Sequence, residues 1–277
     1  MLIRLLNSRD YESVLELLSQ DYPLNLIMIF DVETYGLDNK GHLFHGNYYG
    51  LFKGGRLYAV SCLYNFGSLF FYTADDSLVA PLLKYMAQLK KKPAYLIARA
   101  DLGPRALLEF RGQGVEPCQV HEQHSLGLTR ASFKPSSIAD ARFAQPGDLP
   151  RLMQLHRGFQ QEHFERFTEA EEELGKMALE RMTDSGIAVV EKDGQVVAKA
   201  EVLVHTGRIA QVGAVYTDPG YRGRGCAGAC MTQLCQQILK DREMVILNVA
   251  DDNLPAMALY KSLGFQFMYH SMLAVFS

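Results

Sequence analysis

The chain has 277 residues, which is enough for one large domain or for two domains of ordinary size. Hydrophobic residues make up 48% and charged residues 21%, the balance expected of a globular protein with sizeable cores. The formal net charge is only −3, so the sequence lacks the electrostatic signature of a protein that binds DNA or RNA.

No targeting or membrane segment is predicted. Arg4, Arg9 and Asp10 interrupt the apolar positions at the N-terminus, and no small-residue cleavage site follows, so this segment is not a signal peptide. The longest apolar run, residues 24–30, is too short to cross a bilayer. We expect a cytoplasmic protein without a membrane partner, and its five scattered cysteines predict reduced, buried thiols.

The first half of the chain alternates strand and helix patterns. A hairpin is expected to turn at Gly54–Gly55. In chain order, the predicted elements are a strand at 2–6, a helix at 9–18, strands at 48–52 and 56–64, a helix at 78–89 and a strand at 95–98.

A linker is predicted at residues 131–139, where the sequence ASFKPSSIA is rich in serine and contains Pro135. Beyond it, Asp193–Gly194 is a strong hairpin signal. The predicted elements of this second half are strands at 142–144, 187–191, 195–205, 209–216, 245–249 and 265–274, and helices at 149–159, 168–182, 226–240 and 254–263.

The two halves resemble each other in the order of their elements. Residues 95–115 parallel residues 245–265 as strand, acidic turn, proline, apolar helix and glycine, which indicates a degenerate internal duplication. Only the second half has Arg-Gly-Arg-Gly before its long helix, because residues 73–77 of the first half read Thr-Ala-Asp-Asp-Ser. Phe110 stands where the second half has Tyr260. We therefore predict that the N-terminal copy does not catalyse.

Residues 222–227, Arg-Gly-Arg-Gly-Cys-Ala, join the predicted strand at 209–216 to the helix at 226–240. Glycines allow backbone N–H groups to approach a ligand closely, and a helix N-terminus offers unpaired N–H donors and a positive dipole end. Arg222 and Arg224 add positive charge. This arrangement predicts an anion site suited to a pyrophosphate, and it matches neither a Walker loop nor GxGxxG.

The Arg-x-x-Gly-x-Ala pattern resembles the acetyl-CoA loop of the GNAT superfamily of N-acetyltransferases. The segment 253–265, which runs Asn…Ala…Tyr…Gly-Phe, strengthens the resemblance, which covers roughly residues 139–277. It implies an α/β (α+β) chain of two acyl-CoA N-acyltransferase-like domains, each a mixed, mostly antiparallel sheet flanked by helices. The expected boundaries are a degenerate domain at 1–130, a linker at 131–138 and a catalytic domain at 139–277.

The resemblance also implies residue roles. Backbone groups of Val215, Tyr216 and Thr217 are expected to bind the pantetheine arm of acetyl-CoA, where the strand splays from its neighbour, and Asn253 is expected to contact the same arm. Tyr260 is expected near the thioester sulfur. The residues expected around the pyrophosphate are Arg222, Gly223, Arg224, Gly225, Cys226 and Ala227.

The predicted reaction is direct attack of a neutral primary amine on the thioester carbonyl, with a strand N–H stabilising the oxyanion. Tyr260 is the candidate general acid for the leaving thiolate, against the alternative of an aromatic that packs under the sheet. Glu201 is a candidate base or a solvent-facing strand residue. His156, Glu162 and His163 fall in the region expected to line the acceptor pocket.

Acetyl-CoA is the only cofactor predicted, as a co-substrate, and no metal site is predicted because no cysteine or histidine spacing fits one. The acceptor is expected to be a small-molecule or peptide amine, and a homodimer is possible. Two alternatives stay open: a non-enzymatic acetyl-CoA-binding sensor or scaffold, and transfer of a different acyl group.

Overall fold

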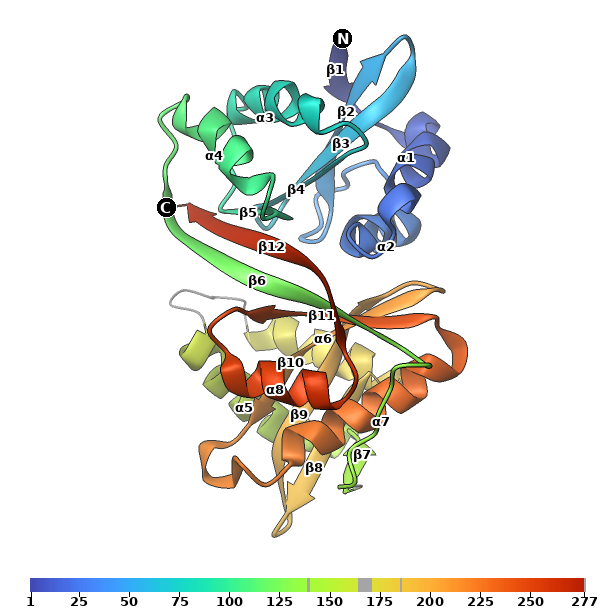
Figure 1. The fold of residues 1–277 in the computed structure, drawn as a ribbon, viewed down its shortest axis with the longest axis vertical. Helices are drawn as coiled ribbons and strands as arrows, with labels where there is room; N and C mark the ends of the chain where they lie inside the picture. The colour runs from blue at the N-terminus through green and yellow to red at the C-terminus, as the bar shows by residue number, and fades with distance from the viewer. Residues whose placement is uncertain (139, 164–170, 185, 277) are drawn as a thin grey trace. The chain divides into compact units, whose positions relative to one another are not determined.

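The computed structural model describes residues 1–276 except 139, 164–170 and 185. For residues 163 and 171–174 it describes the backbone but not the side chains. These residues form two compact units (Figure 1). Unit 1 comprises Met1–Ser125, Val249–Asp252 and Met268–Ser277, and unit 2 comprises Leu126–Asn248 and Asn253–Phe267. The end of the chain, which the family resemblance placed with residues 139–277, thus packs within unit 1.

Unit 1 contains a sheet in the order β1-β2-β3-β4-β5-β12, in which only β4 and β5 are parallel. Residues 117–125 of β6 lie beside β12 in this unit. Its elements are β1 (Leu2–Leu5), η1 (Ser8–Asp10), α1 (Tyr11–Leu18), η2 (Ser19–Asp21), α2 (Leu26–Tyr35), β2 (Gly46–Lys53), β3 (Arg56–Tyr64), β4 (Ser68–Thr73), η3 (Asp76–Leu78), α3 (Val79–Ala87), β5 (Tyr95–Arg99), α4 (Gly103–Arg111), the first part of β6 (Pro117–Thr129) and most of β12 (Gln266–Phe276).

Strand β3 shows how this sheet is covered on both faces. Val60 and Cys62 pack in a cluster with side chains of α1 and α2, whereas Ala59 and Leu63 pack with side chains of α3 and α4. Successive strand residues point to opposite faces, so a strand covered on both faces is apolar almost throughout. The sequence predicted this strand and its hairpin partner, but not α2, β4 or β6.

Unit 2 contains a sheet in the order β11-β10-β9-β8-β7, in which only β10 and β11 are parallel. Helix α7 packs on β7 to β10, and α5 packs on β9 and β10 (Figure 1). The elements of unit 2, besides the end of β6 and 244–248 of β11, are β7 (Ala141–Phe143), η4 (Pro146–Asp148), α5 (Leu149–His163), α6 (Glu171–Thr183), β8 (Ile187–Lys192), β9 (Gln195–His205), β10 (Ile209–Thr217), η5 (Pro219–Tyr221), α7 (Cys226–Asp241) and α8 (Leu254–Ser262), and β11 as a whole is Met244–Ala250.

Every element predicted for this half is found within a few residues of its expected ends, although residues 168–170 of the predicted second helix lie outside the described residues. The hairpin between β8 and β9 turns where expected, with Asp193 at φ 53° and Gly194 at φ 73°. A two-residue turn of type I′ needs two such positive angles, which Asp-Gly adopts readily. The predicted fold class, helices flanking mixed and mostly antiparallel sheets, is confirmed.

All five cysteines are free, as predicted, but only four of them are buried. Cys118 lies exposed on β6, so the expectation that every thiol is buried was wrong for this residue. It sits on a strand whose first residues alternate between exposed and half-buried, which the sequence reading did not identify as a strand. Among the described helices, none combines the length and the apolar character needed to span a membrane.

Candidate functional site

Strands β10 and β11 separate part-way along their length. Their backbone pairing runs only from Ile209 opposite Met244 to Gln211 opposite Ile246. Beyond Gln211, the side of β10 that faces β11 has no partner strand among the described residues. The pairing of β10 with β9 also shifts register between Gly213 and Tyr216, where Ala214 has a positive φ of 47°. A bulge of this kind re-aims backbone groups, so residues 212–217 offer N–H and C=O groups to a ligand lying alongside.

The glycine-rich loop continues directly from this open strand. Gly223 and Gly225 have φ values of 73° and 77°, a region that glycine enters without strain. Gly225 is the N-cap of α7, and no side chain caps the helix. Within the described residues, the backbone N–H groups of residues 223–228 donate no hydrogen bond. The loop therefore presents unpaired donors at the positive end of a 16-residue helix, an arrangement that favours an anion.

Arg222 is held beside the loop by a carboxylate that the sequence did not single out for this role. Its Nη2 lies 2.7 Å from each oxygen of Glu162 on α5, and its Nε donates to the backbone oxygen of Thr217 at 3.0 Å. The hydrogen bonds from Arg222 to Glu162 raise the pKa of the guanidinium further. The two side chains are 48% and 38% exposed, so water screens this ion pair. Arg224 stacks over the ring of Tyr221 at 5.3 Å.

The three strand residues expected at the pantetheine arm lie on the open part of β10. Tyr216 is buried, and its hydroxyl donates to Glu162 at 2.8 Å. Its ring lies so close to Gly158 of α5 that a Cβ there would be 2.6 Å from the hydroxyl. The Oγ1 of Thr217 is buried and has no hydrogen-bond partner among the described residues. Val215 is half-buried.

The remaining cofactor residues occupy helix starts. Asn253 is the N-cap of α8, and its Oδ1 accepts a hydrogen bond from the N–H of Ala256 at 3.2 Å. Cys226 is the buried first residue of α7, and Ala227 follows it half-buried. A small residue at each of these positions lets the chain enter the helix without blocking the loop.

Tyr260 lies in the interior of unit 2. It is 7% exposed, and its ring packs against Phe265 with centroids 5.7 Å apart. Burial raises the pKa of the Tyr260 hydroxyl, and the nearby Cys235 raises it further. Tyr260 therefore stays protonated, as a proton donor must. No hydrogen bond or ion pair of the described residues joins Tyr260 to Glu201, the other predicted catalytic residue.

Glu201 is buried, so the alternative of a solvent-facing residue was wrong. It lies opposite Gly213 of β10, at the edge of the bulge. Its carboxylate forms ion pairs with Lys199, which is fully buried, and with Arg181 of α6 at 2.7 Å. Burial acts most strongly and favours the neutral acid, but the charges of Lys199 and Arg181 outweigh it and lower the pKa of Glu201. A carboxylate stabilised in this way is a weak base.

His156 of α5 joins this cluster, because the ammonium of Lys199 donates to its Nδ1 at 3.3 Å. Burial, together with the charge of Lys199, lowers the pKa of His156 to about 4. The third candidate of this region, His163, has a side chain outside the described residues. The sequence did contain a signal for the pair of Lys199 and Glu201, because two opposite charges lie two residues apart in the apolar middle of a strand.

The lowered pKa of His156 predicts a pH-dependent stability. As the pH falls from about 6.5 to about 4, the unfolded histidine takes up a proton that the folded one refuses. The unfolded state then binds more protons, so the free energy of unfolding decreases with falling pH across this window. We expect the His156→Asn variant to lack this pH-dependent part of the free energy of unfolding. Urea denaturation measures the free energy of unfolding of wild type and variant. The difference between the two should be constant above pH 6.5 and should shift in favour of the variant as the pH falls from about 6.5 to about 4. A difference that does not change with pH would contradict the prediction.

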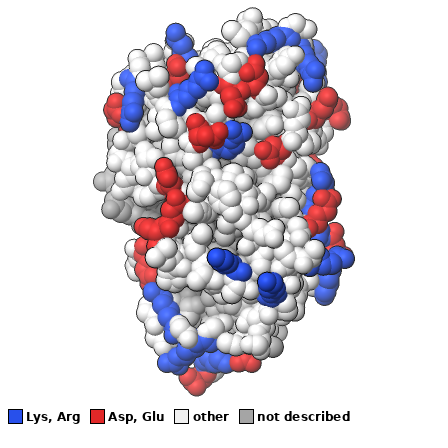
Figure 2. Space-filling view, viewed as in Figure 1, with Lys and Arg blue, Asp and Glu red and all other residues white. Residues whose placement is uncertain are grey.

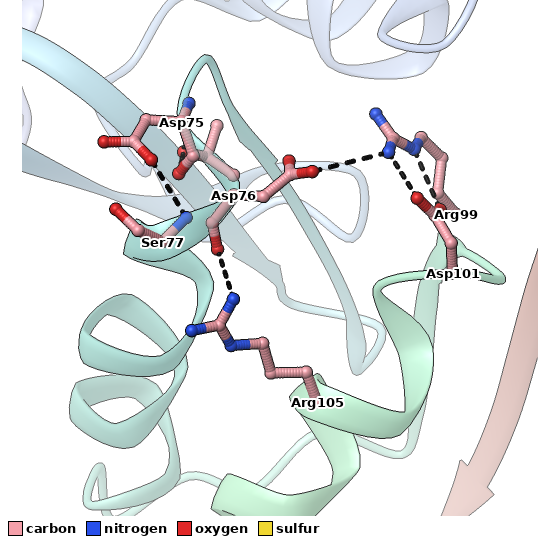
Figure 3. A network of polar contacts seen from close by, with 7 residues as sticks. Asp75, Asp76, Ser77, Arg99, Asp101 and Arg105 are labelled. Atoms are coloured by element: carbon pink, nitrogen blue, oxygen red, sulfur yellow. Dashed lines mark hydrogen bonds and ion pairs between the residues drawn. The ribbon is translucent and has the colours of Figure 1, made fainter.

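The corresponding loop of unit 1 is built differently (Figure 3). Between β4 and α3, the carboxylate of Asp75 accepts a hydrogen bond from the N–H of Ser77 at 2.9 Å and so caps the helical start. Arg105 donates to the backbone oxygen of Asp76 at 3.0 Å, and Arg99 is bound by Asp101. The helix start is thus satisfied by the protein itself, and the loop carries two carboxylates, which would repel a phosphate.

On the face drawn in Figure 2, lysine and arginine side chains are interspersed with aspartate and glutamate. No broad region of this face carries basic side chains alone. It therefore lacks the basic stripe with which proteins bind a phosphate backbone.

Comparison with known proteins shows what this chain is similar to. Residues 150–265 match the model of the Acetyltransferase (GNAT) family. The chain is 28% identical over 191 residues to mycothiol acetyltransferase of Thermomonospora curvata, an alignment that covers 66% of this chain and 64% of that protein. The chain thus spans slightly under two thirds of the length of this relative.

Solved structures share the fold over nearly the whole chain. A GCN5-related N-acetyltransferase from Sphaerobacter thermophilus aligns with a TM-score of 0.68 and 17% identity, over 99% of this chain and 94% of that one. A tandem GNAT protein from the clavulanic acid biosynthesis pathway aligns with a TM-score of 0.64 and 14% identity, over 99% and 98%. The family model matches residues that lie in unit 2 apart from 249–252, whereas the structural likeness extends over both units.

Proposed function

We propose that the chain transfers the acetyl group of acetyl-CoA to a primary amine, because residues 150–265 match the GNAT acetyltransferase family model and the fold is that of a tandem GNAT protein. The observation that carries the proposal is the set of unpaired N–H groups at residues 223–228, next to the open edge of β10. The buried Oγ1 of Thr217, which lacks a partner in the described residues, fits the same cofactor.

Residues of unit 2 bind the cofactor and take part in the transfer. The N–H groups of residues 223–228 and the guanidinium of Arg222 bind the pyrophosphate, and the open edge of β10 binds the pantetheine arm. Acetyl-CoA supplies the activated thioester carbonyl. A backbone N–H at the bulge near Ala214 stabilises the developing oxyanion. The hydroxyl of Tyr260 protonates the leaving thiolate.

Removal of the proton from the amine does not require a strong protein base. The pKa of Glu201 is lowered by Lys199 and Arg181, and that of His156 is about 4, so neither holds a proton firmly near neutral pH. We therefore assign proton removal to ordered water and give Glu201 the role of fixing Lys199 beside the bulge. The same observation favours a second candidate function, a sensor that binds acetyl-CoA without turnover.

We propose that unit 1 binds no acetyl-CoA of its own. Asp75 and Asp76 occupy its counterpart of the pyrophosphate loop, and Phe110, fully buried against Phe276, stands where unit 2 has Tyr260. The functional division is then a non-catalytic domain at 1–130, a linker at 131–138 and a catalytic domain at 139–277.

The proposal is tested by thermal unfolding of the full chain with acetyl-CoA. A ligand at a hundred times its Kd stabilises the folded state by about 2.7 kcal/mol, so Tm should rise and one cofactor should bind per chain. Release of free thiol with a panel of primary amines then separates an enzyme from a sensor. An unchanged Tm at saturating acetyl-CoA would refute the whole proposal, and binding without turnover on any amine would leave the sensor.

Tyr260→Phe removes the proposed proton donor but keeps the ring that packs against Phe265. We expect kcat to fall by about a hundredfold or more, the range of general acid catalysis, with little change in acetyl-CoA affinity. Phe110→Tyr in unit 1 is the matched control and should not alter turnover. If Tyr260→Phe turns over at the wild-type rate, Tyr260 has no part in the mechanism.

Glu162→Gln is expected to tighten acetyl-CoA binding. The substitution leaves at most one neutral acceptor in place of the two 2.7 Å contacts to Arg222, and it removes a negative charge from the vicinity of the pyrophosphate. Because the pair is partly exposed, the gain should be modest, up to about fivefold in Kd, and should shrink at high salt. Titration calorimetry at two salt concentrations measures it. Weaker binding would mean that Glu162 orients Arg222 instead of competing for it.

A further inference from the structure

Three side chains of metal-ligand type meet in unit 1, although they are far apart in the sequence. They are His124 on β6, Asp251 in the turn after β11 and His270 on β12. Each offers one ligand atom, and these atoms all lie within 4.8 Å of one another. The Nε2 of His124 is 3.6 Å from the Oδ1 of Asp251, and the two imidazole rings lie with their centroids 4.6 Å apart at an angle of 67°.

The backbone around the three residues is fixed by hydrogen bonds. The N–H of Asp251 donates to the backbone oxygen of Glu122 on β6 at 3.3 Å, and the backbone oxygen of His270 accepts from the N–H of Ala100 at 2.9 Å. Next to the two histidines, the Oγ of Ser125 donates to that of Ser271 at 3.4 Å. The backbone segments that carry the three side chains are thus held next to one another by hydrogen bonds.

The local environment suits a cation with one side open to water. The side chains of His124 and Asp251 are 22% and 36% exposed, and His270 is exposed. The Oδ1 of Asp251 is itself buried and accepts no hydrogen bond in the described part of the chain. A buried carboxylate oxygen without a donor is uncommon in proteins, and a bound cation would satisfy it.

We propose that His124, Asp251 and His270 bind a divalent transition-metal ion of the Zn²⁺ type. Two imidazoles and one carboxylate form a ligand set for zinc or cobalt, whereas magnesium and calcium prefer oxygen ligands alone. Two atoms bound to one zinc ion at about 2.0–2.1 Å in tetrahedral geometry lie about 3.3 Å apart. The 3.6 Å between His124 and Asp251 already approaches this separation, and a rotation of the His270 side chain would complete the set.

A metal at this point would join three segments of unit 1 that are distant in sequence. Because the ligands come together only in the folded chain, binding energy would add to the stability of the unit. The site lies outside the acyl-transfer residues assigned above, and it does not rest on the proposed function.

The test uses the full chain, freed of metal with a chelator and then titrated with Co²⁺. We expect visible absorption bands of coordinated cobalt that saturate at one ion per chain. Zn²⁺ should abolish the bands at equimolar concentration, whereas Mg²⁺ should leave them unchanged. Addition of Zn²⁺ should also raise Tm of the wild-type chain. The absence of bands, or bands that grow without saturating, would overturn the proposal.

Variants assign the bands to these residues. Co²⁺ binding should weaken by at least about tenfold in each of three variants, His124→Gln, Asp251→Asn and His270→Gln. Loss of a residue that only hydrogen-bonds a metal ligand already costs about tenfold, and loss of a ligand should cost no less. His121→Gln is the control, because His121 is an exposed histidine on the same strand whose ring lies near Gln119. Circular dichroism in chelator should show all four variants folded. Equal binding by wild type and the three ligand variants would refute the site.

Discussion

Gly225→Ala is expected to weaken acetyl-CoA binding by about tenfold or more. Gly225 has φ 77°, a left-handed conformation that costs a residue with a Cβ about 1–2 kcal/mol. A Cβ would also lie 2.1 Å from the Cδ1 of Ile138, so the linker side chain must move. If the loop relaxes to avoid both effects, the N–H groups at the start of α7 no longer converge on the pyrophosphate. Each 1.4 kcal/mol lost from binding is a factor of ten in Kd.

The same loop supplies matched controls. Gly223 has φ 73° but nothing within 4 Å of its would-be Cβ, so Gly223→Ala introduces strain without a clash. Gly220 has no positive φ, and its Cβ would only touch the carboxylate of Asp218 at an ordinary 3.6 Å. Titration calorimetry should therefore rank the loss of affinity as Gly225→Ala largest, Gly223→Ala intermediate and Gly220→Ala negligible. If all three bind acetyl-CoA like the wild type, the loop does not hold the pyrophosphate.

The loop was predictable because its physics is local. Two glycines, two arginines and the start of an amphipathic helix lie within a few consecutive residues, and their consequences do not depend on the rest of the chain. The hairpin at Asp193–Gly194 was predictable for the same reason, since the turn type follows from two adjacent residues. Strand β9, Gln195–His205, was expected with the bounds that it has.

The partners of the site residues were not predictable, because they come from distant segments. Glu162 reaches Arg222 across 60 residues, and Arg181 reaches Glu201 across 20. The sequence gives the charge of each residue but not which charges the fold brings together. His124, Asp251 and His270 match no metal-ligand spacing for the same reason, so a search for motifs passes over them.

Two elements of unit 1 escaped prediction for a different reason. Helix α2, with the sequence LIMIFDVETY, is apolar on several sides and contains the buried Asp31, so it lacks the one-sided pattern that marks a surface helix. Burial raises the pKa of Asp31 to about 7, an environment that no local sequence pattern indicates. Strand β4, Ser68–Thr73, is short and buried, and a short apolar run does not distinguish strand from helix.

Replacing Glu201 with leucine is expected to destabilise the protein by about 3–5 kcal/mol, the cost of removing one partner of a buried ion pair. Lys199 is fully buried, and without Glu201 its ammonium would retain only His156 as a described partner. Lys199→Met should cost less, because Glu201 would keep Arg181, whose side chain is 22% exposed and can also reach water. Urea denaturation of the full chain measures both free energies of unfolding.

The double variant Lys199→Met with Glu201→Leu separates stability from catalysis. Apolar side chains of similar volume often replace a buried ion pair without loss, so we expect the double variant to regain most of the stability that Glu201→Leu loses. If Glu201 only fixes Lys199, a double variant that preserves the bulge at Ala214 should regain turnover. Its acetyl-CoA affinity should recover together with its stability. If Glu201 removes the proton from the amine, stability and affinity return while kcat stays low at every pH. A single Glu201→Leu variant as stable as the wild type would instead show that the ion pair contributes nothing to folding.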